Sequence, residues 1–154
     1  MSKPIIMEAK ITDSKFGFNV KILNPSNIYG AELGDDVFIG PFVEIQKGVK
    51  IGARTKVQSH SFICELVTIG DDCFIGHGVK FVNDLFKLGR PAGGDKSRWV
   101  PTLIENNVSI GTNATILPVK ICSGVVIGAG AVVVHDIQKP GIYVGNPARL
   151  IREI

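Results

Sequence analysis

The stretch AELGDDVFIGPFVEIQKGVKIGARTKVQSHSFI, residues 31–63, repeats one pattern every six residues. A large aliphatic side chain recurs at Leu33, Ile39, Ile45, Ile51, Val57 and Ile63. Two positions before each of these stands a small residue, from Ala31 to Ser61. Because side chains two apart share one face of a strand, both members of each pair point the same way. Each hexad therefore predicts one short strand followed by a bend.

The period of six extends over most of the chain. It continues through Ile69, Ile75 and Phe81, stops, and resumes at Ile104, Ile110, Ile116, Ile121, Ile127 and Val133, with one short hexad before Ile121. This period fits neither a helix nor a plain alternating strand. Fixed repeats of this kind are typical of β-helices, in which each coil buries its inner face by stacking on the next.

Composition agrees with a turn-rich domain that has an aliphatic core. The chain has 154 residues, enough for one domain, and contains 18 glycines, 8 prolines and only 7% aromatic residues. Its net charge of +3 is spread among acidic residues, so we expect no nucleic-acid partner, while a small anionic ligand stays possible. Without a long apolar segment, the sequence predicts a soluble cytoplasmic protein with no membrane partner.

The cysteines and histidines predict no metal centre. Cys64, Cys73 and Cys122 show no CxxC spacing, which argues against a disulfide framework or a zinc ribbon, and Cys73 falls on an inward position. A γ-class carbonic anhydrase needs three converging histidines, two of them close in sequence. No two of the three histidines here, His60, His77 and His135, are close in sequence.

Several segments carry a resemblance to a known family. They are GDDCFIGHGVKFVNDLF (residues 70–86), GTNATILPVKI (111–121), VIGAGAVV (126–133) and VGNPARLIREI (144–154). Over roughly residues 20–150 the chain resembles the hexapeptide-repeat transferases. The resemblance implies an all-β fold, a left-handed parallel β-helix with three hexads per coil, whose hand is an exception among crossover connections. It further implies one domain over residues 1–154, with a loop at about 83–102 and a C-terminal cap at about 140–154.

The resemblance is greatest to the nucleotide-linked 3-amino-sugar N-acetyltransferases of bacterial surface-polysaccharide biosynthesis, especially those acting on dTDP-3-amino-3,6-dideoxyhexoses. The UDP-3-amino-glucuronate acetyltransferases resemble it slightly less. The resemblance implies acetyl-CoA as co-substrate, no metal, and a homotrimer with sites between subunits. Acetyl transfer to another small acceptor, or a non-catalytic scaffold, stays open because such coils serve several functions.

One departure distinguishes N-transfer from O-transfer. Sugar O-acetyltransferases carry a catalytic histidine a few residues after the strand that matches VKF, and Phe86 stands in its place here. A hydroxyl needs a base held against it to attack a thioester, whereas an amine needs only to arrive unprotonated. The sequence therefore favours an amine acceptor.

The interruption from Asn83 to Thr102 is the predicted functional loop. Long excursions from a regular scaffold usually carry function, although a plain surface insertion is the alternative. Glycines that let the loop bend are Gly89, Gly93 and Gly94, and its basic residues are Lys87, Arg90, Lys96 and Arg98. The basic residues either bind phosphates or are simply solvated. Arg90 is the one predicted to bind the substrate. Trp99 either packs the loop onto the body or stacks on a ligand.

Candidate catalytic residues lie where the period stops. Glu65 and Asn83 are 18 apart and so are expected to stack in adjacent coils at the root of the loop. Glu65, Asn83 and Asp84 are predicted to bind the aminosugar, with Asp84 assisting its deprotonation. Glu65 is alternatively a surface residue whose pairing with Asn83 orients the loop. His77 is the best candidate for a base, and His60 is either its neighbour or a surface residue. The oxyanion donor is expected from a backbone N–H near Gly111 or from the Asn83 amide.

The coenzyme A site is taken from the resemblance alone. It points to Gly111, Thr112, Ala129, Val134, His135, Arg149 and Arg152. Edge amides of flat coils suit the pantetheine amides, and arginines suit phosphates. The two arginines are alternatively residues that close the last coil.

Overall fold

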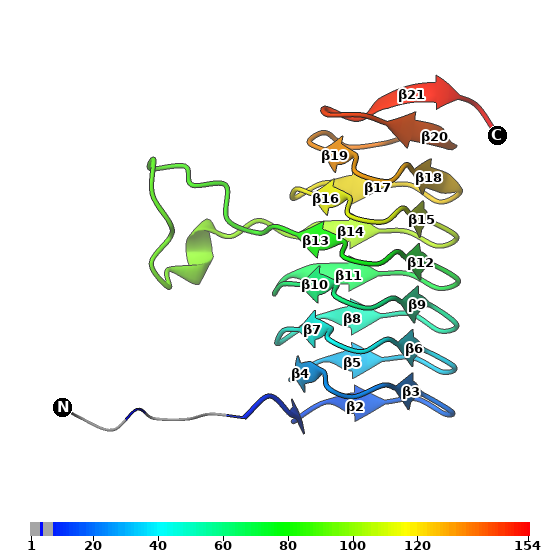
Figure 1. The fold of residues 1–154 in the computed structure, drawn as a ribbon. Helices are drawn as coiled ribbons and strands as arrows, with labels where there is room; N and C mark the ends of the chain where they lie inside the picture. Colours follow the sequence, from blue (N-terminus) through cyan, green and yellow to red (C-terminus); the bar gives the residue numbers. More distant parts are fainter. Residues whose placement is uncertain (1–3, 5–7) are drawn as a thin grey trace.

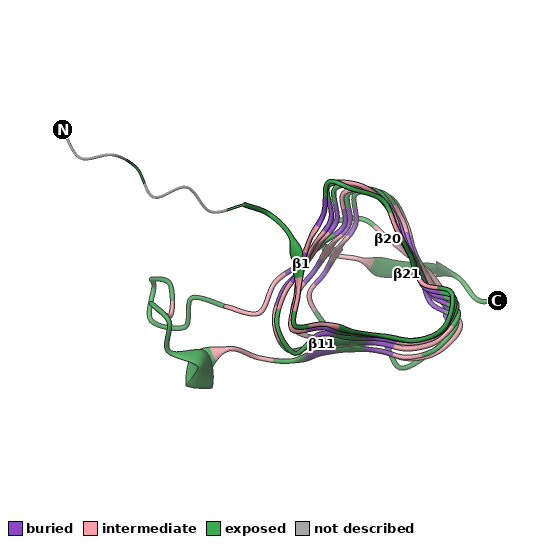
Figure 2. Cartoon of the chain, turned by 90° about the horizontal axis from the view of Figure 1, so that it is seen from below, coloured by how far each residue is buried: buried purple, intermediate pink, exposed green. Residues whose placement is uncertain are grey.

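The computed structural model describes residue 4 and residues 8–154, which form a left-handed β-helix of about seven coils. Figure 1 shows the coils stacked in sequence order, with one long loop leaving the stack halfway. Seen along the axis in Figure 2, the coils superpose as a triangular prism with buried residues along its sides. The predicted fold class is therefore confirmed.

Each side of the prism is one sheet, and successive strands of the chain visit the three sheets in turn. Sheet A contains β1 (Ile11–Thr12), β4 (Asn27–Tyr29), β7 (Glu44–Ile45), β10 (Phe62–Ile63), β13 (Lys80–Phe81), β16 (Thr115–Ile116) and β19 (Val132–Val133). Sheet B contains β2 (Lys15–Phe16), β5 (Glu32–Leu33), β8 (Lys50–Ile51), β11 (Val67–Ile69), β14 (Thr102–Ile104) and β17 (Lys120–Ile121). Sheet C contains β3 (Lys21–Ile22), β6 (Phe38–Ile39), β9 (Lys56–Val57), β12 (Phe74–Ile75), β15 (Ser109–Ile110), β18 (Val125–Ile127), β20 (Gly141–Val144) and β21 (Arg149–Arg152).

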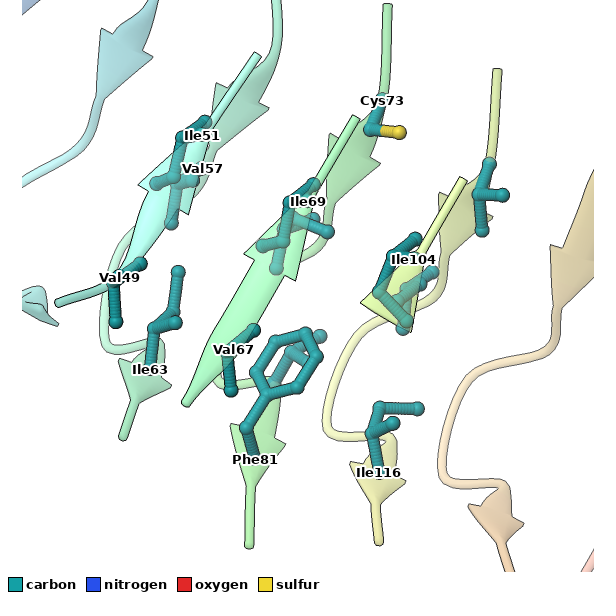
Figure 3. Close-up of a cluster of buried hydrophobic side chains, with 14 of the residues drawn as sticks. Val49, Ile51, Val57, Ile63, Val67, Ile69, Cys73, Phe81, Ile104 and Ile116 are labelled. Atoms are coloured by element: carbon teal, nitrogen blue, oxygen red, sulfur yellow. The ribbon is translucent and has the colours of Figure 1, made fainter. Parts of the chain in front are cut away.

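The pairs of large and small residues found in the sequence form the core. The large positions from Leu33 to Val133 and nearly all their small partners are at most 5% exposed, Cys73 among them. Figure 3 shows Val67, Phe81 and Ile104 among the side chains that meet inside the prism. Thr55 and Ser61 satisfy their buried hydroxyls by donating to the carbonyls of Gly70 and Gly76. Stacked aliphatic layers thus supply the burial that stabilises each coil.

Close contact between coils explains the glycine that follows many of the large residues. A Cβ placed on Gly52 would lie 2.5 Å from the Gly70 carbonyl carbon and 2.6 Å from the Asp71 nitrogen, both backbone atoms of the next coil. Real Cβ atoms do not approach backbone so closely, so the corner requires glycine.

The long loop interrupts the stack without disturbing its register. Ala53 and Asp71, joined across one coil, are 18 apart in sequence, whereas Asp71 and Asn106, joined across the loop, are 35 apart. Phe81 nevertheless pairs with Ile116 in parallel register. The loop ends at Pro101, because Thr102 is buried and begins β14; the expected end was at about residue 102.

The loop itself contains one short 3₁₀ helix, η1 (Lys96–Arg98), which begins after Asp95. Gly89, Gly93 and Gly94 all have positive φ, as expected of bending points. The C-terminal cap is a hairpin in which β20 extends sheet C in parallel and β21 pairs with β20 antiparallel. In Figure 1 this hairpin covers the C-terminal end of the prism.

Candidate functional site

Two edges of the prism carry the predicted site residues. The loop corner joins sheet A to sheet B and comprises residues 64–66, 82–101, 117–119 and 134–136. The His77 corner joins sheet C to sheet A and comprises residues 58–60, 76–78, 111–113 and 128–130. Figure 2 shows the long loop leaving from one edge only.

Asn83 holds both ends of the loop at the loop corner. Its side-chain Nδ2 donates to the carbonyl of Glu65, 3.1 Å away in the coil below. Its own carbonyl accepts from the N–H of Val100 at 2.9 Å, where the chain returns from the loop. The predicted stacking of Glu65 and Asn83 is confirmed, and it places the Asn83 amide at the neck of the loop.

Asp84 organises the first half of the loop. Its Oδ1 accepts from the N–H of Phe86 at 2.9 Å, and its Oδ2 accepts from the N–H of Ala92 at 2.7 Å. The carboxylate is therefore oriented by backbone donors on both oxygens, with its remaining lone pairs available to a ligand. Arg90 is exposed on the same segment.

The Glu65 side chain is paired with a loop residue. Lys96 Nζ lies 2.8 Å from Oε1 and 2.6 Å from Oε2 of Glu65, whose side chain is only 18% exposed. The same ammonium lies 5.4 Å from the centre of the Trp99 ring. Sequence reasoning identified Lys96 only as one of several loop cations, because no periodicity connects a loop residue to a coil.

A polar group of side chains continues below Glu65. Gln46 accepts from the Glu65 N–H at 3.3 Å and donates from Nε2 to Glu44 Oε1 at 3.0 Å. Burial, reinforced by the carboxylates of Glu44 and Glu65, raises the pKa of Tyr29. The coils under the loop thus present carboxylates, which suit an ammonium ligand.

His77 is exposed on the His77 corner, six residues before Asn83. Its Nδ1 lies 2.9 Å from Ser59 Oγ, a partner 18 residues earlier that the ladder spacing could have identified. That contact orients the ring and leaves Nε2 facing outward. His60 is turned elsewhere, because its ring stacks on Phe42 with centroids 4.9 Å apart.

Backbone donors on the His77 corner are partly used between coils and partly without a protein acceptor. The N–H of Gly111 donates to the Ile127 carbonyl at 2.8 Å, so Gly111 itself does not supply an oxyanion donor. Within the described part of the chain, the N–H groups of Thr112 and Ala129 donate to no protein acceptor. Thr112 and Ala129 lie in adjacent coils, as the bond from Gly130 N–H to the Thr112 carbonyl shows. The available donors are therefore one position after the glycines.

The remaining residues of the predicted coenzyme site divide between edges. Val134 and His135 lie on the loop corner, with His135 exposed. Arg149 begins β21 beside the end of the His77 corner, because the N–H of Ala148 donates to the Val132 carbonyl. Arg152 pairs with Ile142 at the other end of the hairpin.

One chain does not bring all candidate residues together. His77 and Asn83 lie at opposite ends of the segment that contains β13, and six extended residues span roughly 20 Å. Asn83, Asp84, Glu65 and Arg90 form one group; His77, Thr112, Ala129 and Arg149 form another. A single centre that uses both groups needs edges from two chains.

The described residues contain neither a candidate metal centre nor a candidate membrane span. Outside residues 1–3 and 5–7, no three His, Cys, Asp or Glu side chains gather in a way that could hold a metal ion. In the same part of the chain, no helix is both long and apolar enough to cross a membrane.

Comparison with known proteins matches the coils to two hexapeptide families. The family described as bacterial transferase hexapeptide (six repeats) matches residues 30–65. The family described as hexapeptide repeat of succinyl-transferase matches residues 66–79 and 101–134. These ranges cover both sides of the long loop and leave the loop itself unmatched.

Among curated relatives, the bifunctional protein GlmU of Thermotoga petrophila is 30% identical over 152 residues, covering 94% of this chain. The chain spans only 34% of the length of that relative.

Two solved structures superpose on most of the prism. The first is an aspartate-to-alanine variant of AntD, an N-acyltransferase from Bacillus cereus in complex with dTDP and coenzyme A. It has a TM-score of 0.80 and 25% identity, and the match covers 91% of this chain and 83% of that one. The second is the hexapeptide-repeat acetyltransferase VCA0836 from Vibrio cholerae O1 biovar eltor with acetyl coenzyme A. Its TM-score is 0.69 with 27% identity, over 80% of this chain and 70% of that one.

The repeat, the triangular prism, the loop at its edge and these matches agree with one another. The chain belongs to the hexapeptide-repeat transferase family.

Proposed function

We propose that the protein is an acetyl-CoA-dependent N-acetyltransferase acting on the 3-amino group of a dTDP-linked 3-amino-dideoxyhexose, in the biosynthesis of a bacterial surface polysaccharide. The observation that carries this proposal is the superposition on AntD, an N-acyltransferase solved with dTDP and coenzyme A, over 83% of its length. Phe86, standing where O-acetyltransferases have a histidine, supports an amine acceptor over a hydroxyl.

The loop corner is the proposed acceptor site. Asp84 offers its carboxylate to an aminosugar ammonium, and Arg90 offers a guanidinium to the nucleotide phosphates. The Asn83 amide retains one N–H after its bond to Glu65, and that hydrogen is available to the sugar or to the acetyl oxygen.

The His77 corner is the proposed donor site. The unpaired N–H groups of Thr112 and Ala129 suit the pantetheine carbonyls, in the way an added strand pairs with a sheet edge. Arg149 and Arg152 project from exposed β21 and suit phosphate groups. Gly111 allows the close approach of neighbouring coils. Val134 and His135 lie on the loop corner, so in this proposal they contact the coenzyme that is bound to the His77 corner of a second copy of the chain.

The reaction is direct acetyl transfer. Asp84, or His77 through Nε2, takes a proton from the sugar ammonium, and the freed nitrogen lone pair forms a bond to the acetyl carbonyl carbon. The Thr112 N–H or the Asn83 amide donates to the oxyanion. The intermediate then breaks its carbon–sulfur bond, and the leaving thiolate takes up the second proton of the nitrogen. Positioning of two bound substrates supplies most of the rate gain.

A homotrimer is part of this proposal. The proposed acceptor and donor groups lie on two edges of one chain, separated by the width of sheet A, about 20 Å. Three prisms packed side by side place the loop corner of one chain against the His77 corner of the next. Each centre then receives one edge from each of two subunits.

A thiol-release assay tests the reaction. The full chain is incubated with acetyl-CoA and a panel of dTDP- and UDP-linked 3-amino sugars, with the matched 3-hydroxy sugars and no acceptor as controls. We expect saturable coenzyme A release with a dTDP-3-amino-dideoxyhexose and none with its 3-hydroxy counterpart. Preference for a UDP-linked 3-amino sugar would correct the nucleotide, and equal rates with the hydroxy sugar would contradict N-transfer. If none of the acceptors in the panel causes coenzyme A release, the non-catalytic scaffold is the interpretation that remains.

A further inference from the structure

We infer that Lys96 is a positioning residue that fixes the long loop on the coil body. Its partner there is Glu65, which is therefore not a direct ligand of the sugar. The pairing is two-pronged, since both carboxylate oxygens of Glu65 lie within 2.8 Å of the same ammonium. The two residues are 31 apart in sequence, and the contact joins the returning part of the loop to the coil body at its base.

The Glu65 carboxylate is partly buried, which favours a close pair with the Lys96 ammonium. Its side chain is 18% exposed, against 58% for Lys96. An ion pair that is shielded on one side is less screened by solvent than a fully exposed one. With both oxygens engaged and little surface left, Glu65 has less room for a sugar hydroxyl than Asp84 has.

The loop presents Lys96 in a fixed direction. Asp95 accepts from the N–H of Ser97 at 3.2 Å and pairs with Arg98 at 2.8 Å, which closes the short helix η1 around Lys96. Trp99 follows, and its ring lies 5.4 Å from the ammonium, within the range of a cation–π contact. The charged group is therefore held between a carboxylate and an indole.

The Lys96–Glu65 pair adds to the hydrogen bonds that Asn83 makes at the neck of the loop. Asn83 ties the start of the loop to Glu65 and to Val100, while Lys96 ties the distal segment to the same residue. Glu65 thus meets the loop twice, through its carbonyl and through its carboxylate. The loop that carries Asp84 and Arg90 is preorganised before substrate arrives, which in the proposed function sets the acceptor geometry.

Trp99, the only tryptophan in the chain, reports the docking without any activity measurement. We expect Lys96→Met and Glu65→Gln each to raise the acrylamide quenching constant of Trp99 fluorescence about twofold, because the distal segment opens to solvent. Lys96→Arg and the charge-swapped pair Glu65→Lys with Lys96→Glu should restore the native value. Lys87→Met removes a cation from the same loop away from the pair and should leave it unchanged.

Kinetics then test positioning, which rests on the proposed function. Lys96→Met should raise KM for the acceptor and lower kcat/KM roughly tenfold with the KM for acetyl-CoA unchanged, since misplacement of a substrate-orienting loop slows transfer. Unchanged Trp99 quenching in Lys96→Met and Glu65→Gln would overturn the docking, whatever the activity. Altered quenching with native kinetics would overturn the positioning role alone. If no acceptor is acetylated by the native chain, the proposed function fails while the fluorescence result still decides the docking.

Discussion

Asn83 and Val100 close the long loop at its neck, with the Asn83 carbonyl accepting the Val100 N–H at 2.9 Å. The same asparagine reaches down to the Glu65 carbonyl through its side chain. One residue therefore determines both where the chain leaves the coil and where it returns.

Replacing Asn83 by alanine should lower kcat/KM for the aminosugar roughly 100-fold, because a proposed oxyanion donor is removed together with the side-chain tie. Asn106→Ala is the matched control, since it removes one similar bond, from Asp71 N–H to Asn106 Oδ1, on another corner. Both variants should lose about 1 kcal/mol of unfolding free energy, and only Asn83→Ala should lose activity. Equal kinetics in the two variants would contradict the assignment.

Replacing Thr112 by proline should weaken coenzyme A binding about tenfold, because it deletes an N–H that no protein acceptor uses. The turn accepts proline: Gly40–Pro41 occupies the same corner position as Gly111–Thr112 in a lower coil. The melting temperature should therefore not fall. Calorimetric titration with coenzyme A measures the effect, and Thr112→Ala, which keeps the N–H, isolates the contribution of the hydroxyl. Native affinity in the proline variant would remove Thr112 from the donor site.

The Arg54–Asp72 pair should contribute to acid sensitivity. Two hydrogen bonds of 2.7 Å from the Arg54 guanidinium lower the pKa of Asp72 below its ordinary value of 3.8. A carboxyl with a lowered pKa in the folded state stabilises the protein above its unfolded pKa, and this contribution is lost as the pH falls through the folded value. Asp72→Asn, which keeps a residue tolerant of the positive φ of 56°, should therefore melt lower than the native chain at pH 7. The difference should shrink at pH values below 3.8, and a constant difference across that range would contradict the linkage.

Phe81 supports the coil from which the loop departs. It is 1% exposed, so Phe81→Ala should lower the free energy of unfolding by about 3–5 kcal/mol in urea titrations. Phe18, which is 80% exposed, provides the matched control, and its alanine variant should change stability by less than about 0.5 kcal/mol. Comparable losses in both variants would mean that the inward register is wrong.

The fold was predictable because one rule repeats. A period of six places the same two positions inward in every coil, and the structure buries those positions, including Phe81 and Cys73. The pairing of Glu65 with Asn83 followed from the coil length of 18. The spacing of 18 residues could also have identified Ser59 as the residue beneath His77. The hexad pattern could likewise have shown that His77 and Asn83 lie at opposite ends of the segment that contains β13.

The remainder of the site was not accessible from periodicity. Where Lys96 lands depends on a segment without repeats, and its Glu65 partner is 31 residues away. The engagement of the Gly111 N–H depends on which of two adjacent backbone donors meets the next coil, which side-chain patterns do not encode. The cap is similar, since β21 turns back antiparallel where a further hexad would have continued in parallel.

Phe81 pairs with Ile116 in regular register, so the long loop is an insertion between two coils that stack directly on each other. Residues 82–101 leave and re-enter the prism at neighbouring points, joined by the bond from the Val100 N–H to the Asn83 carbonyl, so the coils on either side of the loop stay in contact. In the proposed function, a different segment at this point would change the acceptor site and leave the proposed coenzyme edge intact. The proposed acceptor contacts are thus concentrated in one segment, while the residues of the repeats are constrained by packing between coils.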